Sequence, residues 1–425
     1  MLAGSSDLRG GTGVLRKRGV TAAPARGHRW RPVAYTAVGL ASLLVLGGTG
    51  FAWTQLSRLD TGLATADVIA PSAQVPSGRA SLSVDQNILL VGLDSRTDLQ
   101  GNPLPQDVLD QLHAGDAADG GDTTDTMIVV HIPAGGGSAS AISIPRDSYV
   151  QIAGGFGKHK INSAYTYGKQ AALDTLREQG LTGAALERAA SAAGARTAIE
   201  TVEDFTGLTI NHYAAVNLAG FYALSNAVGG VPVCLKQAVH DSYSGADFPA
   251  GEQTLSGAQA LAFVRQRHGL PSGDLDRIAR QQAFLSGMAQ VVLGAGTLTN
   301  PLKLSGLIDA VQRSVVLDQG WDVLTFAEQM HGLTSGSITF ATIPVQSLSL
   351  QTPYDGDAVK VDPVQVRDFI TALLGGPAAA TRGGSTATTP ASVAKQAAET
   401  AGATTTTPST IAPETASTDL SGCVN

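Results

Sequence analysis

Asn87-Ile-Leu-Leu-Val-Gly-Leu93 is a mainly apolar run of strand length, and Asp94 follows it directly. Such runs are typical of strands that are buried on both faces of a sheet. The same pattern recurs in three places, Met127 to Ile132, Ala139 to Ile144 and Ile338 to Ile343. Open α/β sheets bind their ligands at the carboxyl ends of strands. Asp94 is therefore a candidate site residue.

Helical periodicity fills segments between these strands. It predicts three helices, Lys169 to Gln179, Leu186 to Phe205 and Leu218 to Val228. Strands and helices that alternate along a chain indicate an α/β domain, because each helix must bury its apolar face against the sheet. We therefore predict an α/β/α sandwich over residues 84–375, with a central mixed sheet and helices on both of its faces.

The composition limits the class of protein. The chain has 425 residues, 43% of them hydrophobic, and a formal net charge of −7. This length allows one large domain with accessory segments. The acidic balance argues against a nucleic-acid partner, because nucleic-acid binding requires an excess of basic side chains.

An apolar run from Val33 to Trp53 contains no charged side chain and follows a basic segment, residues 1–32. About twenty apolar residues span a bilayer as a helix, and basic residues hold their flank in the cytoplasm. The sequence therefore predicts a single-pass protein of the cell membrane, with residues 1–32 inside and everything after Trp53 outside. A cleaved signal peptide is the alternative, because Ala64-Thr-Ala66 has the small-residue pattern of a cleavage site.

Two segments that flank the domain are poor in large apolar side chains. Residues 54–83 are predicted to be a spacer, and residues 376–425, rich in Ala, Thr, Ser and Pro, a disordered tail. The two cysteines are Cys234, in a predicted strand, and Cys423, near the end of the tail. Outside the cell they can form a disulfide that ties the tail to the domain. The alternative for Cys234 is a buried core thiol.

Four arginines lie close together between residues 265 and 280. In an extended segment, Arg265 and Arg267 would point to the same side. The helix predicted next begins at one of two aspartates and carries two more arginines and a glutamine, namely Asp274, Asp276, Arg277, Arg280 and Gln281. Arginine forks and helix N-termini both bind phosphate oxygens, so this window predicts a phosphate site. A surface lattice of salt bridges between the same arginines and aspartates is the alternative.

A second carboxylate accompanies Asp94. Asp125 lies just before the predicted strand that begins at Met127. Two carboxylates beside phosphates suit Mg²⁺, which keeps several waters and takes only one or two protein carboxylates. We therefore expect Asp94 and Asp125 to hold Mg²⁺. The alternative is that both are ordinary loop aspartates at strand ends.

In these features the chain resembles the LytR-CpsA-Psr family of cell-envelope phosphotransferases. The resemblance covers about residues 84–375 and rests on motifs that occur in the expected order. They are Asn87-Ile-Leu-Leu-Val-Gly-Leu-Asp94-Ser-Arg96, Asp125-Thr-Met127, Ser143-Ile-Pro-Arg146-Asp147, Lys160-Ile-Asn162-Ser-Ala-Tyr165, and the segment from Leu255 to Gln281 that contains the arginine cluster.

The resemblance implies roles for individual residues. Asp94 and Asp125 would be the magnesium ligands. The pyrophosphate contacts would come from Arg96, Arg146, Arg265, Arg267, Arg277 and Gln281. The remaining substrate-binding residues would be Lys160, Asn162, Asp274 and Arg280. The resemblance also implies that an apolar pocket in the sandwich holds a polyprenyl chain.

The activity implied by the resemblance is phosphoryl transfer. The donor would be a glycopolymer linked to polyprenyl pyrophosphate, the acceptor a hydroxyl of peptidoglycan, and the product a phosphodiester. Arginines and Mg²⁺ would neutralise the charge that develops on the phosphoryl group. Two alternatives remain open, a polyprenyl-pyrophosphate pyrophosphatase and a non-catalytic regulator that binds lipid-linked sugars.

The chain departs from the family pattern in two places. Residues 97–121 form an insertion between the two aspartates, which lie closer together in much of the family, and this insertion can hold extra ligands or form a lid. Thr123-Thr124 precede Asp125 where relatives often carry an arginine, so a phosphate contact there is in doubt. Other catalytic motifs, such as His-Glu-x-x-His or Gly-x-Ser-x-Gly, do not occur in the sequence.

Overall fold

The computed structural model describes residues 63–76, 81, 83–116, 122–135, 138–293, 301–323, 325–326, 338–375, 415–416 and 423–425. The predicted cytoplasmic segment and the predicted membrane span, Val33 to Trp53, lie outside these residues. Within the described ranges, no helix combines the length and the apolar character that crossing a membrane requires.

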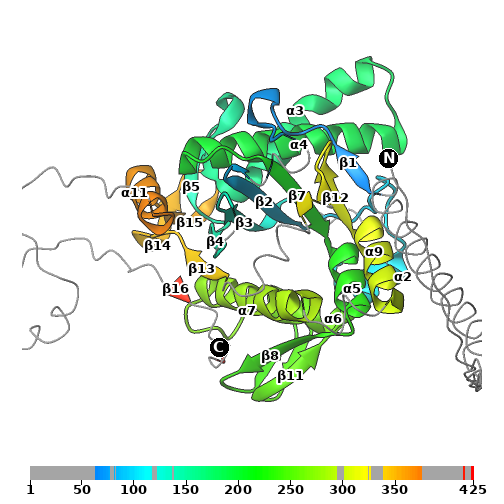
Figure 1. Ribbon diagram of the computed structural model, residues 1–425, viewed down its shortest axis with the longest axis vertical. Helices are drawn as coiled ribbons and strands as arrows, with labels where there is room; N and C mark the ends of the chain where they lie inside the picture. Colours follow the sequence, from blue (N-terminus) through cyan, green and yellow to red (C-terminus); the bar gives the residue numbers. More distant parts are fainter. Residues whose placement is uncertain are drawn as a thin grey trace, which may run out of the picture. The chain divides into compact units, whose positions relative to one another are not determined.

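A mixed sheet lies at the centre of the domain (Figure 1). In the described part of the chain it has eight strands, in the order β1-β12-β7-β2-β3-β4-β13-β16. Their bounds are Ala64–Ala66 (β1), Val315–Asp318 (β12), His212–Asn217 (β7), Gln86–Leu93 (β2), Thr124–Ile132 (β3), Ser140–Ser143 (β4), Thr339–Thr342 (β13) and Thr415–Ala416 (β16). β2 runs parallel to β7 and antiparallel to β3, and β4 runs parallel to β13. The predicted α/β domain with a central mixed sheet is confirmed.

Helices lie on both sides of this sheet (Figure 1). The described helices are α2 (Gln106–Gln111), α3 (Ala164–Glu178), α4 (Gly183–Thr206), α5 (Leu218–Ala227), α6 (Gly257–Arg265), α7 (Asp274–Leu293), α9 (Pro301–Ser314) and α11 (Pro363–Leu373). Two-stranded antiparallel sheets pair β5 (Tyr149–Ile152) with β6 (Gly157–Lys160), β8 (Val231–Leu235) with β11 (Gly251–Leu255), β9 (Val239–Asp241) with β10 (Ala246–Phe248), and β14 (Ser347–Thr352) with β15 (Gly356–Lys360).

Side chains of the central strands alternate between two apolar layers, because successive strand residues point to opposite faces. Leu89 and Val129 pack in one cluster with Val202 of α4. Leu90 packs in another with Leu285 of α7. The sheet is therefore buried on both faces, which explains the near-continuous apolar runs in β2 and β3.

The pair α3 and α4 packs closely because two glycines lie at the contact. A Cβ on Gly168 would lie 2.2 Å from Thr197 Oγ1, and one on Gly194 would lie 2.6 Å from the Tyr165 carbonyl oxygen. α4 then ends at Gly207, whose φ of 76° is the left-handed C-cap conformation that glycine adopts at low cost. These contacts fix α4 against α3 on one side of the sheet.

The fold extends into segments where the sequence predicted a spacer and a tail. Residues 64–66 form β1, which pairs with β12, and residues 415–416 form β16, which pairs with β13. The signal that was missed is pairing with distant strands, which a window of local composition does not contain.

The last three residues, Cys423, Val424 and Asn425, are held against the domain, and we call them the C-terminal tripeptide. Cys423 forms a disulfide with Cys234 of β8. The Val424 N–H donates to the Cys234 carbonyl at 3.0 Å, and the Lys236 N–H donates to the Val424 carbonyl at 2.8 Å. Cys234 is therefore a bridge residue and not a core thiol.

Candidate functional site

A cavity of about 190 Å³ lies between the sheet and α7, and we call it the α7 cavity. Its polar lining includes five residues that the sequence predicted for the site, Asp94, Asp125, Arg265, Arg277 and Gln281. The rest is mainly apolar and comes from the sheet and from α5, α6 and α7, including Leu90, Ile128, Val216, Phe221, Leu261, Phe284 and Leu285. The cavity therefore combines charged groups with apolar walls.

The pairing of β2 with β3 brings the two aspartates together. Leu93 pairs with Thr124 while Gly92 pairs with Thr126, so Asp125 is an extra residue in the ladder. A bulge of this kind re-aims a side chain and is common beside active sites. Asp94 is fixed next to it, because its N–H donates to the Thr123 carbonyl at 3.0 Å.

Arg146 connects three aspartates. Its Nη1 lies 2.5 Å from Asp125 Oδ1, and its Nε lies 3.7 Å from Asp147 Oδ2 and 3.8 Å from Asp274 Oδ1. Burial by itself lowers the pKa of Arg146. The carboxylates of Asp125, Asp147 and Asp274 together raise it by more than burial lowers it, so the net shift is upward. Arg146 therefore stays charged in a site that excludes most water.

Arg277 and Asp274, both on the first turn of α7, form a second buried pair. Arg277 Nη2 lies 2.6 Å from Asp274 Oδ1, and the Arg277 side chain is 3% exposed. Burial lowers the pKa of Arg277 and raises the pKa of Asp274, and their attraction opposes both shifts. The Nε atoms of Arg277 and Arg146 are buried without a hydrogen-bond partner among the described residues. Buried donors of this kind are rare in native proteins and suit an anionic ligand.

Arg96 has a different role from the predicted contact with a ligand. Its Nη1 lies 2.6 Å from Asp94 Oδ1, while its Nε and Nη2 donate to the Ala114 carbonyl at 3.1 and 2.8 Å. Arg96 is 8% exposed and is not among the residues that line the α7 cavity. It therefore positions Asp94 and fastens the insertion.

The insertion itself is a packed wall over its described residues, up to residue 116. Leu109 of α2, Leu112 and Ala114 are buried in an apolar cluster with residues of α6 and α7, such as Phe263 and Phe284. No described side chain of the insertion lines the α7 cavity. The expectation that the insertion adds ligands there is therefore not met.

The prediction of an extended segment at residues 265 to 267 was wrong. Arg265 is the last residue of α6, and its Nη1 donates to the Leu112 and His113 carbonyls at 3.0 and 3.2 Å. Arg267 lies beyond the helix, is 47% exposed, and reaches Asp147 at 3.8 Å. The two guanidinium groups therefore have different partners, and only Arg265 lines the α7 cavity.

The assignment of Arg280 to substrate binding was also wrong. Its guanidinium hydrogen-bonds to Gln266 Oε1 and to the carbonyl oxygen of Asn425, and it lies 5.2 Å from the centre of the Phe263 ring. Burial lowers the pKa of Arg280 to about 10. Arg280 therefore anchors the C-terminal tripeptide and is not available to a substrate.

Lys160 and Asn162 lie at the edge of the ionic network. Lys160 Nζ lies 3.3 Å from Asp147 Oδ1, whereas Asn162 contributes through its backbone, with its N–H donating to the Arg146 carbonyl at 3.1 Å. Asp147 thus joins Arg146, Lys160 and Arg267. The one signal for Asp147 in the sequence is its place beside Arg146.

In the ionic network five basic side chains form ion pairs with four aspartates, and Arg265, which bonds to two backbone carbonyls, lies beside them. Together the six basic side chains exceed the aspartates by two charges. They are Arg96, Arg146, Lys160, Arg265, Arg267 and Arg277, with Asp94, Asp125, Asp147 and Asp274. Apart from the exposed Arg267, the members of the network are buried or half-buried, so the alternative of a surface salt-bridge lattice does not describe it. An anion with two charges would balance it.

The donor set also fits Mg²⁺. The residues that the structure describes contain no group of three or more His, Cys, Asp or Glu side chains placed to hold a metal ion. Asp94 and Asp125 nevertheless line the same cavity. Mg²⁺ needs no more than two protein carboxylates when waters and phosphate oxygens supply the rest.

We expect Arg277→Lys to weaken binding of a pyrophosphate ligand by roughly 1.5 to 3 kcal/mol, or about 10- to 100-fold in Kd. A lysine keeps the charge but cannot replace the fork that reaches Asp274 and the ligand together. The matched control is Arg267→Lys, because Arg267 is 47% exposed and lies outside the cavity lining. Calorimetric titration measures both, and equal effects of the two substitutions would contradict the assignment.

The chain is similar to known proteins. The model of the LytR_cpsA_psr family matches residues 61–368. The chain is 46% identical over 346 residues to a Corynebacterium glutamicum protein named cell wall biosynthesis protein LcpA, a match that covers 81% of this chain and 66% of that protein's length.

Two further matches were found. The chain is 32% identical over 199 residues to an Enterococcus faecalis protein named polyisoprenyl-teichoic acid–peptidoglycan teichoic acid transferase TagU, covering 47% of this chain and 56% of that one. A crystal structure of a Streptococcus agalactiae protein superposes with a TM-score of 0.52 at 19% identity, covering 72% of this chain and 93% of the other. That likeness concerns the fold alone.

Proposed function

The chain belongs to the LytR-CpsA-Psr family, and from this premise we propose that it transfers a glycopolymer from a polyprenyl-pyrophosphate carrier to a hydroxyl of peptidoglycan, through a phosphodiester bond. One observation carries the proposal. The α7 cavity joins apolar walls to a buried ionic network with an excess of two positive charges. A pyrophosphate esterified at both ends carries two negative charges and, in this carrier, an apolar chain.

The volume of the α7 cavity limits how the carrier would bind. A cavity of about 190 Å³ is smaller than a typical ligand pocket. It suits the part of a polyprenyl chain next to the pyrophosphate, and the rest of the chain would remain in the bilayer. A membrane-bound carrier and a membrane-bound enzyme would then meet at one surface.

The residues of the chain would act mainly by position and charge. Arg277, Arg146 and Arg265 would hold the pyrophosphate, and Gln281 would donate to one of its oxygens. The acceptor hydroxyl oxygen loses its proton and forms a bond to the phosphorus next to the sugar. The bond from that phosphorus to the bridging oxygen breaks, and polyprenyl phosphate leaves and takes up the proton. Arginines held by carboxylates in a dry site are preorganised for the charge that develops there.

Mg²⁺ fits the same scheme as the cofactor. Asp94 and Asp125 would hold it, and when bound it would neutralise phosphate charge as a Lewis acid. Arg96 would keep Asp94 oriented in the way it does in the protein alone.

Transfer rather than hydrolysis is the expected reaction, because a positioned hydroxyl reacts far faster than its concentration suggests. A labelled lipid-linked oligosaccharide is supplied with and without un-cross-linked peptidoglycan strands, and we expect label on the strands only when they are present. Equal release of sugar phosphate in both cases, with no labelled strands, would favour a pyrophosphatase. Tight binding without turnover would favour a regulator.

The proposed location is the outer face of the cell membrane, supported by the basic residues before Val33 and the uncharged run that follows. Protease added to intact protoplasts should therefore digest the domain and leave residues 1–32 protected. Loss of an N-terminal epitope with survival of the domain would reverse the orientation.

A further inference from the structure

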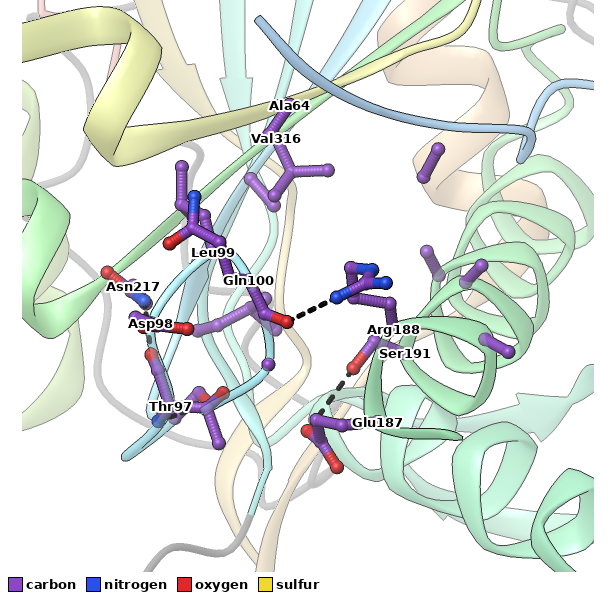
Figure 2. Close-up of a pocket in the computed structure, with 18 of the residues that line it drawn as sticks. Ala64, Thr97, Asp98, Leu99, Gln100, Glu187, Arg188, Ser191, Asn217 and Val316 are labelled. Carbon is purple, nitrogen blue, oxygen red and sulfur yellow. Dashed lines mark hydrogen bonds between the residues drawn. The ribbon is translucent and has the colours of Figure 1, made fainter. Parts of the chain in front are cut away.

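A second cavity, of about 530 Å³, lies on the other face of the sheet, and we call it the α4 cavity. Ala215 of β7 lines it, whereas the neighbouring residues Ala214 and Val216 line the α7 cavity. α4 and the first residues of the insertion face each other across it (Figure 2). Its volume lies within the range of about 300 to 1,000 Å³ that is typical of ligand sites.

The α4 cavity adjoins the ionic network. Leu93 and Ser95 line it, while Asp94, the residue between them, lines the α7 cavity. Asn217, at the end of β7, lines both. The two cavities are therefore separated by the ends of the paired strands β2 and β7, and a ligand in one lies next to a group bound in the other.

The wall formed by the insertion is fixed in place (Figure 2). Arg188 Nη1 of α4 donates to the Gln100 carbonyl at 2.6 Å, and Asn217 Nδ2 donates to the Thr97 carbonyl at 2.6 Å. A Cβ on Gly101 would lie 2.8 Å from the Ala184 carbonyl oxygen, so the loop passes close to the helix. Because the wall is already formed, binding a ligand has a lower entropic cost.

The lining of the α4 cavity alternates small apolar and hydrogen-bonding side chains. Eleven of its 22 lining residues carry polar side chains, compared with seven of 20 in the α7 cavity. They come from β1, the insertion, α3, α4 and β7, and include Asp98, Gln100, Glu187, Arg188 and Ser191. Between them lie alanines of α4 such as Ala189 and Ala192. Several of these groups bond to one another or to the backbone, as Arg188 Nη1 does to the Gln100 carbonyl, and their remaining donors and acceptors suit a polar ligand better than a hydrocarbon chain.

An N-acetylated sugar matches such a lining. Its hydroxyl and amide groups need several hydrogen-bonding partners around the ring, and its ring carbons and acetyl methyl group need small apolar contacts. We propose that the α4 cavity binds an N-acetylhexosamine unit of the acceptor glycan, next to the pyrophosphate at Asp94. This inference rests on the proposed function, and it names the subsite that the acceptor occupies.

Filling the cavity tests the proposal. Ala189→Phe introduces a ring where Ala189 now borders the cavity, and Glu200→Phe introduces the same side chain at an exposed position of α4 outside it. The full chain in lipid nanodiscs is titrated with a soluble tetrasaccharide of alternating N-acetylglucosamine and N-acetylmuramic acid. We expect Ala189→Phe to raise the Kd at least about 10-fold through a built-in clash, and Glu200→Phe to leave it unchanged.

A second variant guards against misfolding. Arg188→Ala removes a hydrogen-bonding group without adding bulk. We expect it to raise the glycan Kd by about 10-fold, because the hydrogen bonds lost are those from a charged guanidinium to the glycan. Thermal unfolding checks the fold of each variant, and pyrophosphate binding should stay at the wild-type level in both. Folded Ala189→Phe and Arg188→Ala with wild-type glycan affinity would overturn the site.

The transfer assay separates this inference from the proposed function. Wild-type transfer with an unchanged KM for the acceptor in Ala189→Phe would overturn the glycan subsite and leave the function standing. Glycan binding that Ala189→Phe weakens, in a chain that transfers nothing, would support the subsite and overturn the function. Binding of decanoate in the cavity in place of the tetrasaccharide would overturn the subsite in favour of a lipid.

Discussion

Asp125→Ala and Asp94→Ala are each expected to lower the rate of magnesium-dependent transfer by roughly 100- to 1,000-fold, as removal of one preorganised charge-stabilising group does in other enzymes. Both carboxylates line the α7 cavity, and each is paired with an arginine, at 2.5 Å for Asp125 and 2.6 Å for Asp94. Removing either one leaves a single carboxylate for Mg²⁺ and releases the arginine that it orients. Steady-state transfer at increasing Mg²⁺ measures the effect.

The control for this pair is Asp174→Ala, since the Asp174 side chain on α3 is 90% exposed. It should leave both the rate and its dependence on Mg²⁺ unchanged. Calorimetric titration of Mg²⁺ with a pyrophosphate ligand present separates a lost metal site from a lost arginine contact. Unchanged metal affinity in both Asp94→Ala and Asp125→Ala would remove the two aspartates from the metal site.

Cys423→Ser should destabilise the domain by as much as about 5 kcal/mol, which is the chain-entropy value for so long a loop. The disulfide to Cys234 spans 189 residues. The loss includes the contacts of Val424 and Asn425, because without the bridge the C-terminal tripeptide must bind by three residues alone. Chemical denaturation of the oxidised protein and of the variant measures the difference.

Reduction of the wild-type protein provides the matched comparison. It should reproduce the stability of Cys423→Ser, since both lack the same bond, and should not lower the stability of the variant further. A variant as stable as the oxidised protein would mean that the bridge contributes little and that Arg280 and the backbone hydrogen bonds of Val424 hold the tripeptide.

The sequence was sufficient for the elements whose local pattern is strong. β2 and β3 contain near-continuous apolar runs because both of their faces are covered, and α4 shows a long helical period. Arg265 was placed in an extended segment because it stands two residues from Arg267. Its preceding residues include the good helix formers Leu261 and Ala262, and residues 260–264 are all buried. The helix therefore continues to Arg265.

Other site residues depended on contacts between remote segments. Arg277 and Gln281 are four residues apart and share one face of α7, whereas Arg280 binds Asn425, which is 145 residues away in the chain. The position of Asp147 follows from Lys160 and Arg267, which come from two other segments. Local spacing contains no information on such pairings. The role of Arg280 as an anchor for Asn425 and the role of Asp147 as a partner of Lys160 and Arg267 could therefore not be derived from the sequence.

The C-terminal tripeptide binds Arg280 and Cys234, which the ribosome synthesises much earlier than the tripeptide itself. A ribosome adds about 5 to 20 residues per second, so the 145 residues from Arg280 to Asn425 take roughly 7 to 30 s to synthesise. Throughout that interval the guanidinium of Arg280 has no carbonyl of Asn425 to bind, and Cys234 has no partner thiol. Residues 423–425 therefore reach Arg280 and Cys234 only well after the segments that they bind have been synthesised.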